Sequence, residues 1–335
     1  MSLVGVGGGA GTDAGDLDAL VGSGAERFEA TLAGGGVAAG AEMALRIETA
    51  RRDTSNRYRA WAALTEAYLF ESGGHRRRVA GARVERTAEL ALRSGFDLGS
   101  LALASEVSAG PVNPISEAVT EAVRQGDKAG LREAFMRGDQ LLRRIHDFRC
   151  DLLSDQLGAI YREEGPEGLE AAMLFAAARG SWKTSMPADL ALEPNRRLRE
   201  LAFFLTVCAH FRIKFTDEGE RWQIDVLECG RCGRQCRDRY TDPDWGLEVV
   251  RVPGPLTFGR PPMTIYQTHM AVIHHQFAID EFGTPWPVFD CRGFRDDAGG
   301  CRMLVYKDPW AAPEEVFAAV GRQKPVRRAT AGPGG

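Results

Sequence analysis

The spacing of apolar residues divides the chain into two parts. From about residue 16 to 208, segments rich in Ala, Leu, Glu and Arg carry apolar residues three and four positions apart, the period of an amphipathic helix. The pattern predicts helices over 16–32, 37–50, 55–71, 76–94, 114–125, 128–164, 166–178 and 195–209. The segment 128–164 fits either one long helix or two.

After residue 209 the apolar positions alternate, as in strands with one buried face. Strands are predicted at 211–216 and 221–227, with a hairpin turn between them, and shorter ones at 247–252, 286–289 and 302–306. Helices are predicted at 263–283 and 312–321. The chain is therefore expected to be α+β, with a mainly helical N-terminal half followed by a small antiparallel sheet with a flanking helix.

Four segments follow from these patterns. Residues 1–15 form a glycine-rich leader that is predicted to be disordered, and 324–335 form a disordered tail. Between them lie a helical domain at 16–194 and an α+β domain at 195–323, which contains most of the cysteines and histidines.

Composition narrows the function classes. The net charge is −4 and arginines alternate with acidic residues, which disfavours a protein that tracks nucleic-acid phosphates. Since no apolar run approaches the roughly 18–20 residues of a membrane span, no membrane segment is expected. Seven cysteines, without the features of a signal peptide, indicate a reducing cytoplasm and metal or catalytic use of the thiols.

Three cysteines are clustered where the second strand ends. Cys229-Gly-Arg-Cys232 has the spacing of a zinc knuckle or of one half of a redox dithiol, and Cys236 follows four residues later. Zinc bound by these three thiolates would need one further donor, taken from Cys208, Cys291, Cys301 or His269. Zinc, an iron–sulfur cluster and unligated thiols are all left open by the sequence.

The helix predicted at 263–283 carries three of the six histidines, at positions 269, 274 and 275. At 100° per residue these three rings cannot share one metal ion. Tyr266, His269 and Asp280, by contrast, fall on one largely apolar face, which would suit the wall of a small-molecule pocket.

The strand that follows this helix ends in Asp290-Cys291. A thiolate beside an imidazole is a nucleophile for an electrophilic carbon, such as that of an amidine, thioimidate or thioester. We therefore predict a pocket between the helix and the sheet. His269, with a pKa near 6.5, would be the general acid/base there, and Cys291, Cys229 or a bound water the nucleophile.

Several of these segments together resemble the L-2-amino-thiazoline-4-carboxylic acid hydrolase-like family over roughly residues 195–308. They are Val226-Leu-Glu-Cys229-Gly, Tyr266-x-x-His269, Phe289-Asp-Cys291 and Gly299-Gly-Cys301. The resemblance implies a hydrolase of a C–N bond or heterocycle, with a thiazoline- or amidine-like substrate, in specialised metabolism such as antibiotic biosynthesis. The chain departs from the family in having Cys229-Gly-Arg-Cys232 in place of a Cys-Pro pair, and the helical half is not explained by it.

Two other functions are compatible with the same residues. One is a ring-forming or eliminating enzyme in which His269 or Asp280 is the general base and no cysteine reacts. The other is a non-catalytic, zinc-stabilised sensor, or a protein that docks onto a partner or a second copy through its helical half. The expected ligand of the enzymatic alternatives is a small molecule.

Overall fold

The computed structural model describes residues 17–71, 86–96, 115–240, 242–291 and 301–326. Within these residues a helical first half is followed by a small antiparallel sheet with flanking helices, so the predicted α+β class is confirmed. The predicted leader at 1–15 and residues 327–335 of the predicted tail lie outside the described residues.

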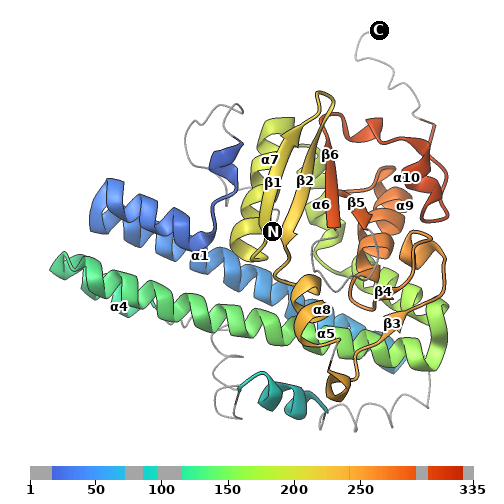
Figure 1. The fold of residues 1–335 in the computed structure, drawn as a ribbon, viewed down its shortest axis with the longest axis horizontal. Coiled ribbons are helices and arrows are strands. Elements are labelled where there is room, and N and C mark those ends of the chain that lie inside the picture. The colour runs from blue at the N-terminus through green and yellow to red at the C-terminus, as the bar shows by residue number, and fades with distance from the viewer. Residues whose placement is uncertain (1–16, 72–85, 97–114, 241, 292–300, 327–335) are drawn as a thin grey trace.

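Two long helices, α1 (Gly24–Glu71) and α5 (Lys128–Arg179), pack side by side and form the base of the molecule (Figure 1). Each of these helices covers segments that the sequence predicts as separate helices. The chain only kinks at a glycine between those segments and forms no loop there. Gly36 has a φ of 76° and Gly165 a φ of 69°, left-handed values that a residue without a Cβ adopts at little cost. The stretch 128–164 is therefore one helix.

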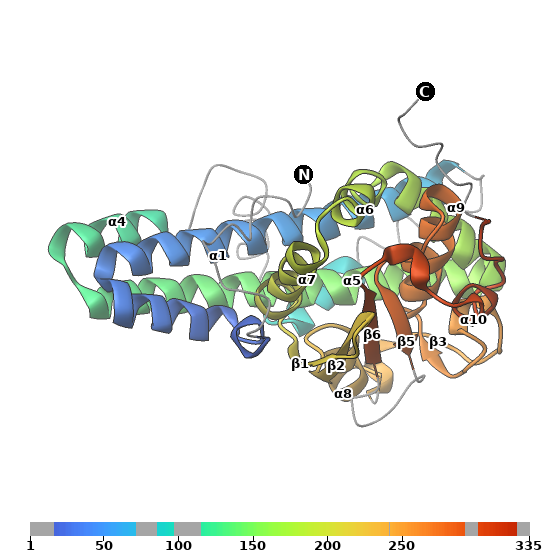
Figure 2. The same cartoon turned by 90° about the horizontal axis from the view of Figure 1, so that it is seen from above.

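Shorter helices surround this pair (Figure 2). Residues 86–93 are helical, and the others are α4 (Ser116–Gln125), α6 (Trp182–Leu190), α7 (Pro194–Phe203), α8 (Cys232–Asp238), α9 (Ala278–Phe282) and α10 (Glu314–Ala318). Two segments are π-helical: η2 (Phe204–Cys208), which continues α7, and η5 (Met270–Phe277), which leads into α9. The described residues also contain four single turns of 3-10 helix: η1 (Asp18–Leu20), η3 (Pro243–Trp245), η4 (Pro255–Thr257) and η6 (Pro309–Ala311).

The sheet has the strand order β1-β2-β6-β5 and is antiparallel throughout. Its strands are β1 (Arg212–Asp217), β2 (Arg221–Glu228), β5 (Val288–Cys291) and β6 (Cys301–Tyr306). Alternation along β2 buries Trp222, Ile224 and Val226, which turns one face of the sheet toward the core. The strand predicted at 247–252 shrinks to β3 (Val249–Val250), which pairs with β4 (Met263–Thr264) in a second sheet.

No strand precedes Arg212 in the part of the chain that the structure describes, as the change of apolar period predicts. One hydrophobic cluster nevertheless joins the two halves, since it includes Tyr58 and Trp61 of α1, Leu153 of α5 and Ile224 of β2. The boundary at residue 194 thus stays a prediction. Among the described helices, none is both long and apolar enough to cross a membrane.

Candidate functional site

A cavity of about 60 Å³ lies between η5, the sheet and the segment formed by α7 and η2. This exceeds the ~10–15 Å³ that one water molecule requires, so a few waters or a small organic group could occupy it. Apolar side chains form most of the wall, and a few polar groups converge on it, as in many small-molecule sites. The residues on the wall are Leu201, Phe204, Leu205, Phe211, Cys229, Arg231, Cys232, Tyr266, His269, Met270, His274, Pro287, Phe289, Cys301 and Met303.

Two imidazoles on this wall have a fixed tautomer. Nδ1 of His269 is hydrogen-bonded to the carbonyl oxygen of Tyr266, and Nδ1 of His274 lies 2.8 Å from the carbonyl oxygen of Trp286. Because a carbonyl oxygen can only accept, each Nδ1 carries a proton and each neutral ring keeps its lone pair on Nε2. The ring centroids are 5.6 Å apart.

The neighbouring positions of His269 and His274 correct the interpretation of this segment as a regular helix. At 100° per residue the two side chains would point about 140° apart. The segment is instead π-helical from Met270, with hydrogen bonds between residues five apart, and His274 follows His269 by five positions. The change of period brings both rings to one cavity.

The other site residues predicted on this segment do not all reach the cavity. Tyr266 does line the cavity, and its hydroxyl is hydrogen-bonded to the hydroxyl of Tyr58. Asp280 is exposed, is absent from the cavity wall and forms an ion pair with Arg322, with Oδ1 2.8 Å from Nε. His275 also faces elsewhere, and its Nε2 accepts the backbone N–H of Phe289 at 2.8 Å.

Burial sets the protonation of the two cavity histidines. It lowers the pKa of His269 to about 3, with further contributions from His274 and Arg231, and it lowers the pKa of His274 to about 4, with a contribution from Arg231. The expected pKa near 6.5 is therefore not that of His269 in the folded protein. Both rings are neutral at pH 7 and can accept protons, but they have none to donate from Nε2.

Arg231 is the cation of the cavity, and no pattern in the sequence marked it as a site residue. Its Nε and Nη2 atoms are buried without a hydrogen-bond partner, and no carboxylate among the described residues forms an ion pair with it. The guanidinium carbon lies 4.8 Å from the ring centroid of Phe204 and 5.1 Å from that of Tyr58. A buried charge without a counterion is costly, which makes this group a candidate for binding an anion.

The Cys229–Cys232 turn carries Arg231 and two thiols to the cavity. The two Sγ atoms are 3.3 Å apart, and the backbone N–H of Arg231 points to Cys229 Sγ at 3.4 Å. Glycine is required at position 230, since a Cβ there would lie 2.5 Å from the carbonyl oxygen of Ala209. Cys301 lines the same cavity, whereas Cys236 is buried on α8 and is not part of the wall.

The thiols of this turn are protonated at neutral pH. Burial and the neighbouring Cys232 raise the pKa of Cys229 well above its usual value. The hydrogen bond with Cys229 lowers the pKa of Cys232, but Cys301 and burial outweigh this effect and raise it. In the described part of the chain, no group of three or more His, Cys, Asp or Glu side chains is placed to hold a metal ion. Zinc binding by Cys229, Cys232 and Cys236 stays a prediction.

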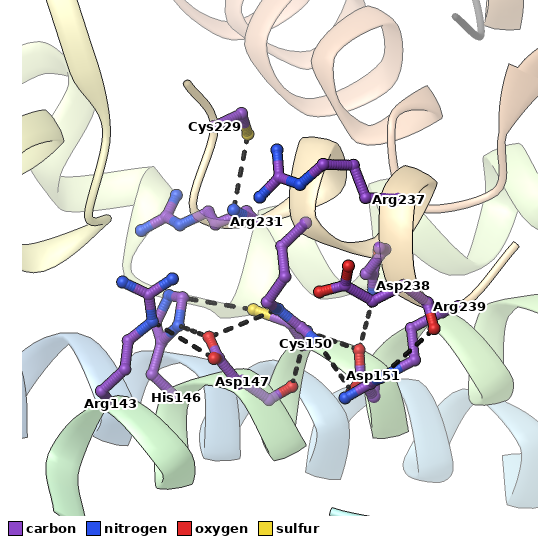
Figure 3. A network of polar contacts seen from close by, with 12 residues as sticks. Arg143, His146, Asp147, Cys150, Asp151, Cys229, Arg231, Arg237, Asp238 and Arg239 are labelled. Atoms are coloured by element: carbon purple, nitrogen blue, oxygen red, sulfur yellow. Dashed lines mark hydrogen bonds and ion pairs between the residues drawn. The ribbon is translucent and has the colours of Figure 1, made fainter. Parts of the chain in front are cut away.

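The turn is fixed to α5 through Asp151, which has no solvent exposure (Figure 3). Its carboxylate accepts hydrogen bonds from Arg234 at 2.6 Å, from Gln235 at 3.0 Å and from Arg239 at 3.1 Å. These three donors lie on or directly after α8, and Arg234 and Gln235 also reach Asp147 and Ser154 of the same helix. The carboxylate of Asp151 is therefore the centre of the contacts that hold α8, and the cysteine turn before it, against α5.

A second group of titratable side chains lies on α5 beneath Arg231 (Figure 3). His146 donates from Nδ1 to Asp147 at 3.0 Å, and its Nε2 lies 3.8 Å from the sulfur of Cys150. Cys150 is completely buried, and burial raises its pKa to about 12. It is absent from the cavity wall.

Cys291 ends β5, where its backbone is in register with Cys301 of β6. Its side chain lies outside the described part of the structure, so the prediction that it is a nucleophile is untested.

Comparison of the chain with protein-family models, with curated proteins and with solved structures gives no significant match.

Proposed function

We propose that this chain is an enzyme that binds a small organic carboxylate in the cavity and hydrolyses a C–N bond or a heterocycle in it. The observation that carries the proposal is Arg231, a buried guanidinium that lacks a counterion among the described residues and lies on the same wall as two neutral imidazoles. The family resemblance over residues 195–308 also implies a reaction of this type.

The guanidinium would supply the recognition. Arginine binds carboxylates through two parallel hydrogen bonds, and Nε and Nη2 of Arg231 are both buried and unused. The apolar body of the ligand would contact the surrounding wall, including Phe211, Met270 and Phe289. The volume of about 60 Å³ favours a compact ligand.

The bound carboxylate would also activate the base. Arg231 contributes to the low pKa of both His269 and His274, because a nearby positive charge disfavours an imidazolium. A carboxylate that neutralises Arg231 would remove this effect and raise both pKa values. Since a general base works best when its pKa is near the operating pH, binding of the substrate would make these rings more effective.

In the proposed reaction Nε2 of His269 takes a proton from a water molecule, and the resulting oxygen nucleophile attacks the electrophilic carbon of the substrate. The imidazolium formed on His269 can then return its proton to the leaving nitrogen. Tyr266 borders the site, and its pKa is raised well above 10 by burial, so its hydroxyl stays protonated and can donate a hydrogen bond.

Binding of small cyclic carboxylates, each compared with its methyl ester, tests the recognition step. We expect calorimetry to show binding of at least one acid and not of its ester. Arg231→Met should weaken that binding by roughly 10- to 150-fold, the value of a hydrogen bond to a charged group. Arg237→Met is the matched control, because Arg237 lies on the exposed side of α8. Its Nη2 atom is 3.8 Å from Oε1 of Glu228.

Equal binding of acid and ester, or equal losses in the two arginine variants, would contradict the proposal. Binding that depends on Arg231 but is not followed by turnover, as monitored by mass spectrometry of the ligand, would instead favour the non-catalytic sensor.

A further inference from the structure

We propose that Cys229 and Cys232 are a redox-active pair that closes to a disulfide by exchange with a low-molecular-weight disulfide entering the cavity. This inference is independent of the proposed hydrolase function, because it requires neither a carboxylate ligand nor His269. It rests on the contact between the two sulfurs, on the groups around them and on their place in the cavity wall.

The two sulfurs are already in contact. Their separation of 3.3 Å must shorten to the roughly 2.05 Å of a disulfide bond, and both cysteines lie in one short turn. The second cysteine begins α8, which Asp151 holds in place, and the first directly follows β2. Closing the bond therefore requires only a local movement of the turn.

Burial keeps both thiols protonated, so the attack begins when one of them loses its proton, and the groups around Cys229 are arranged to receive its thiolate. The backbone N–H of Arg231 points to its sulfur at 3.4 Å, and the unpaired guanidinium of Arg231 interacts favourably with a negative charge on it. Hydrogen-bond donors and a nearby cation stabilise a thiolate, which is the reactive form of cysteine. Cys232 has Cys301 as a second sulfur neighbour, and it is suited to the resolving role.

The small disulfide reaches the pair through the cavity, whose wall includes Cys229, Cys232 and the partly exposed Cys301. The Cys229 thiol gives up its proton, its sulfur attacks one sulfur of the small disulfide to form a mixed disulfide, and the thiolate that is released takes up that proton. Cys232 then attacks the Cys229 sulfur, forming the intramolecular disulfide and releasing the second small thiol. Two protein thiols are oxidised, and one small disulfide is reduced to two thiols.

Bis(2-hydroxyethyl) disulfide, which is neutral and compact, is a suitable probe for a cavity of about 60 Å³, with a chelator present so that bound metal cannot mask the thiols. We expect the intact native chain to lose two hydrogen atoms by mass spectrometry. Trypsin cleaves after Arg231, so Cys229 and Cys232 fall on different peptides. These peptides should be joined after oxidation and separate after reduction with dithiothreitol.

Two variants and one reagent complete the test. Cys232→Ser should stop at a stable mixed disulfide of 2-mercaptoethanol with Cys229, whereas the matched Cys236→Ser should still form the internal bond. On the unaltered chain, phenylarsine oxide, which bridges neighbouring thiols, should protect Cys229 and Cys232 together from alkylation. The proposal is wrong if bis(2-hydroxyethyl) disulfide leaves both thiols reduced, if the bond joins other cysteines, or if phenylarsine oxide protects neither.

Discussion

At the scale of single residues, the site consists of one cation beside two neutral bases. Arg231 has no counterion among the described residues, and His269 and His274 are each held by a backbone carbonyl that leaves Nε2 as the acceptor. Each part is incomplete by itself. The cation lacks an anion, and the pKa values of the two imidazoles, about 3 and about 4, lie far below pH 7. An anionic ligand would supply the counterion and would also remove the part of the pKa depression that Arg231 causes, while the larger part due to burial would remain.

The catalytic role of His269 is tested with His275 as the comparison. On a carboxylate that the chain turns over, His269→Gln should lower kcat by about 10²- to 10⁴-fold, the usual contribution of general acid–base catalysis. His275→Gln should change kcat little, because its Nε2 is occupied by the N–H of Phe289 and its ring is absent from the cavity wall. Full activity of the His269 variant would remove this residue from the mechanism.

At the scale of elements, a π-helix and a buried anchor build the site. The π-helix η5 aligns residues five positions apart and so brings His269 and His274 together, while it directs Asp280 to the surface. Asp151 of α5 holds α8 and thereby fixes the turn that carries Arg231 and the two thiols. The cavity wall therefore depends on contacts between segments far apart in sequence.

Asp151→Ala tests this anchor. The substitution leaves the guanidinium groups of Arg234 and Arg239 without this carboxylate, and removing one partner of a buried ion pair costs about 3–5 kcal/mol. We expect a loss of this size in the free energy of unfolding, measured by urea denaturation. Glu281→Ala removes the exposed ion pair with Lys183 and should cost less than about 1 kcal/mol. Similar losses in the two variants would show that Asp151 is not a special anchor.

At the scale of the whole molecule, the helical half and the sheet enclose one hydrophobic cluster and bury several histidines in it. Burial lowers the pKa of His146 and His274 to about 4 and that of His269 and His275 to about 3. In the unfolded chain these groups have pKa values near 6.5. The unfolded state therefore binds more protons than the folded state in mildly acidic solution.

This difference predicts the pH dependence of stability. The contribution of each histidine to the free energy of unfolding is complete above about pH 6.5. It is lost as the pH falls toward the pKa of that histidine in the folded state, at about 1.4 kcal/mol per pH unit. Urea denaturation at pH 7 and pH 5 should show the chain less stable at pH 5. His275→Gln should reduce the difference in the free energy of unfolding between pH 7 and pH 5 by about the contribution of one histidine. An unchanged difference would mean that His275 is not held neutral by the fold.

Much of the fold follows from the sequence because apolar periodicity is a local property. The change from a helical to an alternating period near residue 209 predicts the helical half, the β1–β2 hairpin and β6. It also predicts helices that end near Gly36 and Gly165, but not that the chain would only kink there, because packing of α1 against α5 decides whether the helix continues.

The sequence by itself marked the cysteine turn, Tyr266 and His269, since unusual residue types are visible at fixed spacing. Only the tertiary structure placed them on one wall, added His274 and Arg231, and separated Asp280 and Cys236 from it. The physical reason is twofold. A π-helix of eight residues is too short for its longer period to be recognised in the sequence, and the missing counterion of an arginine becomes visible only when every neighbouring element is in place.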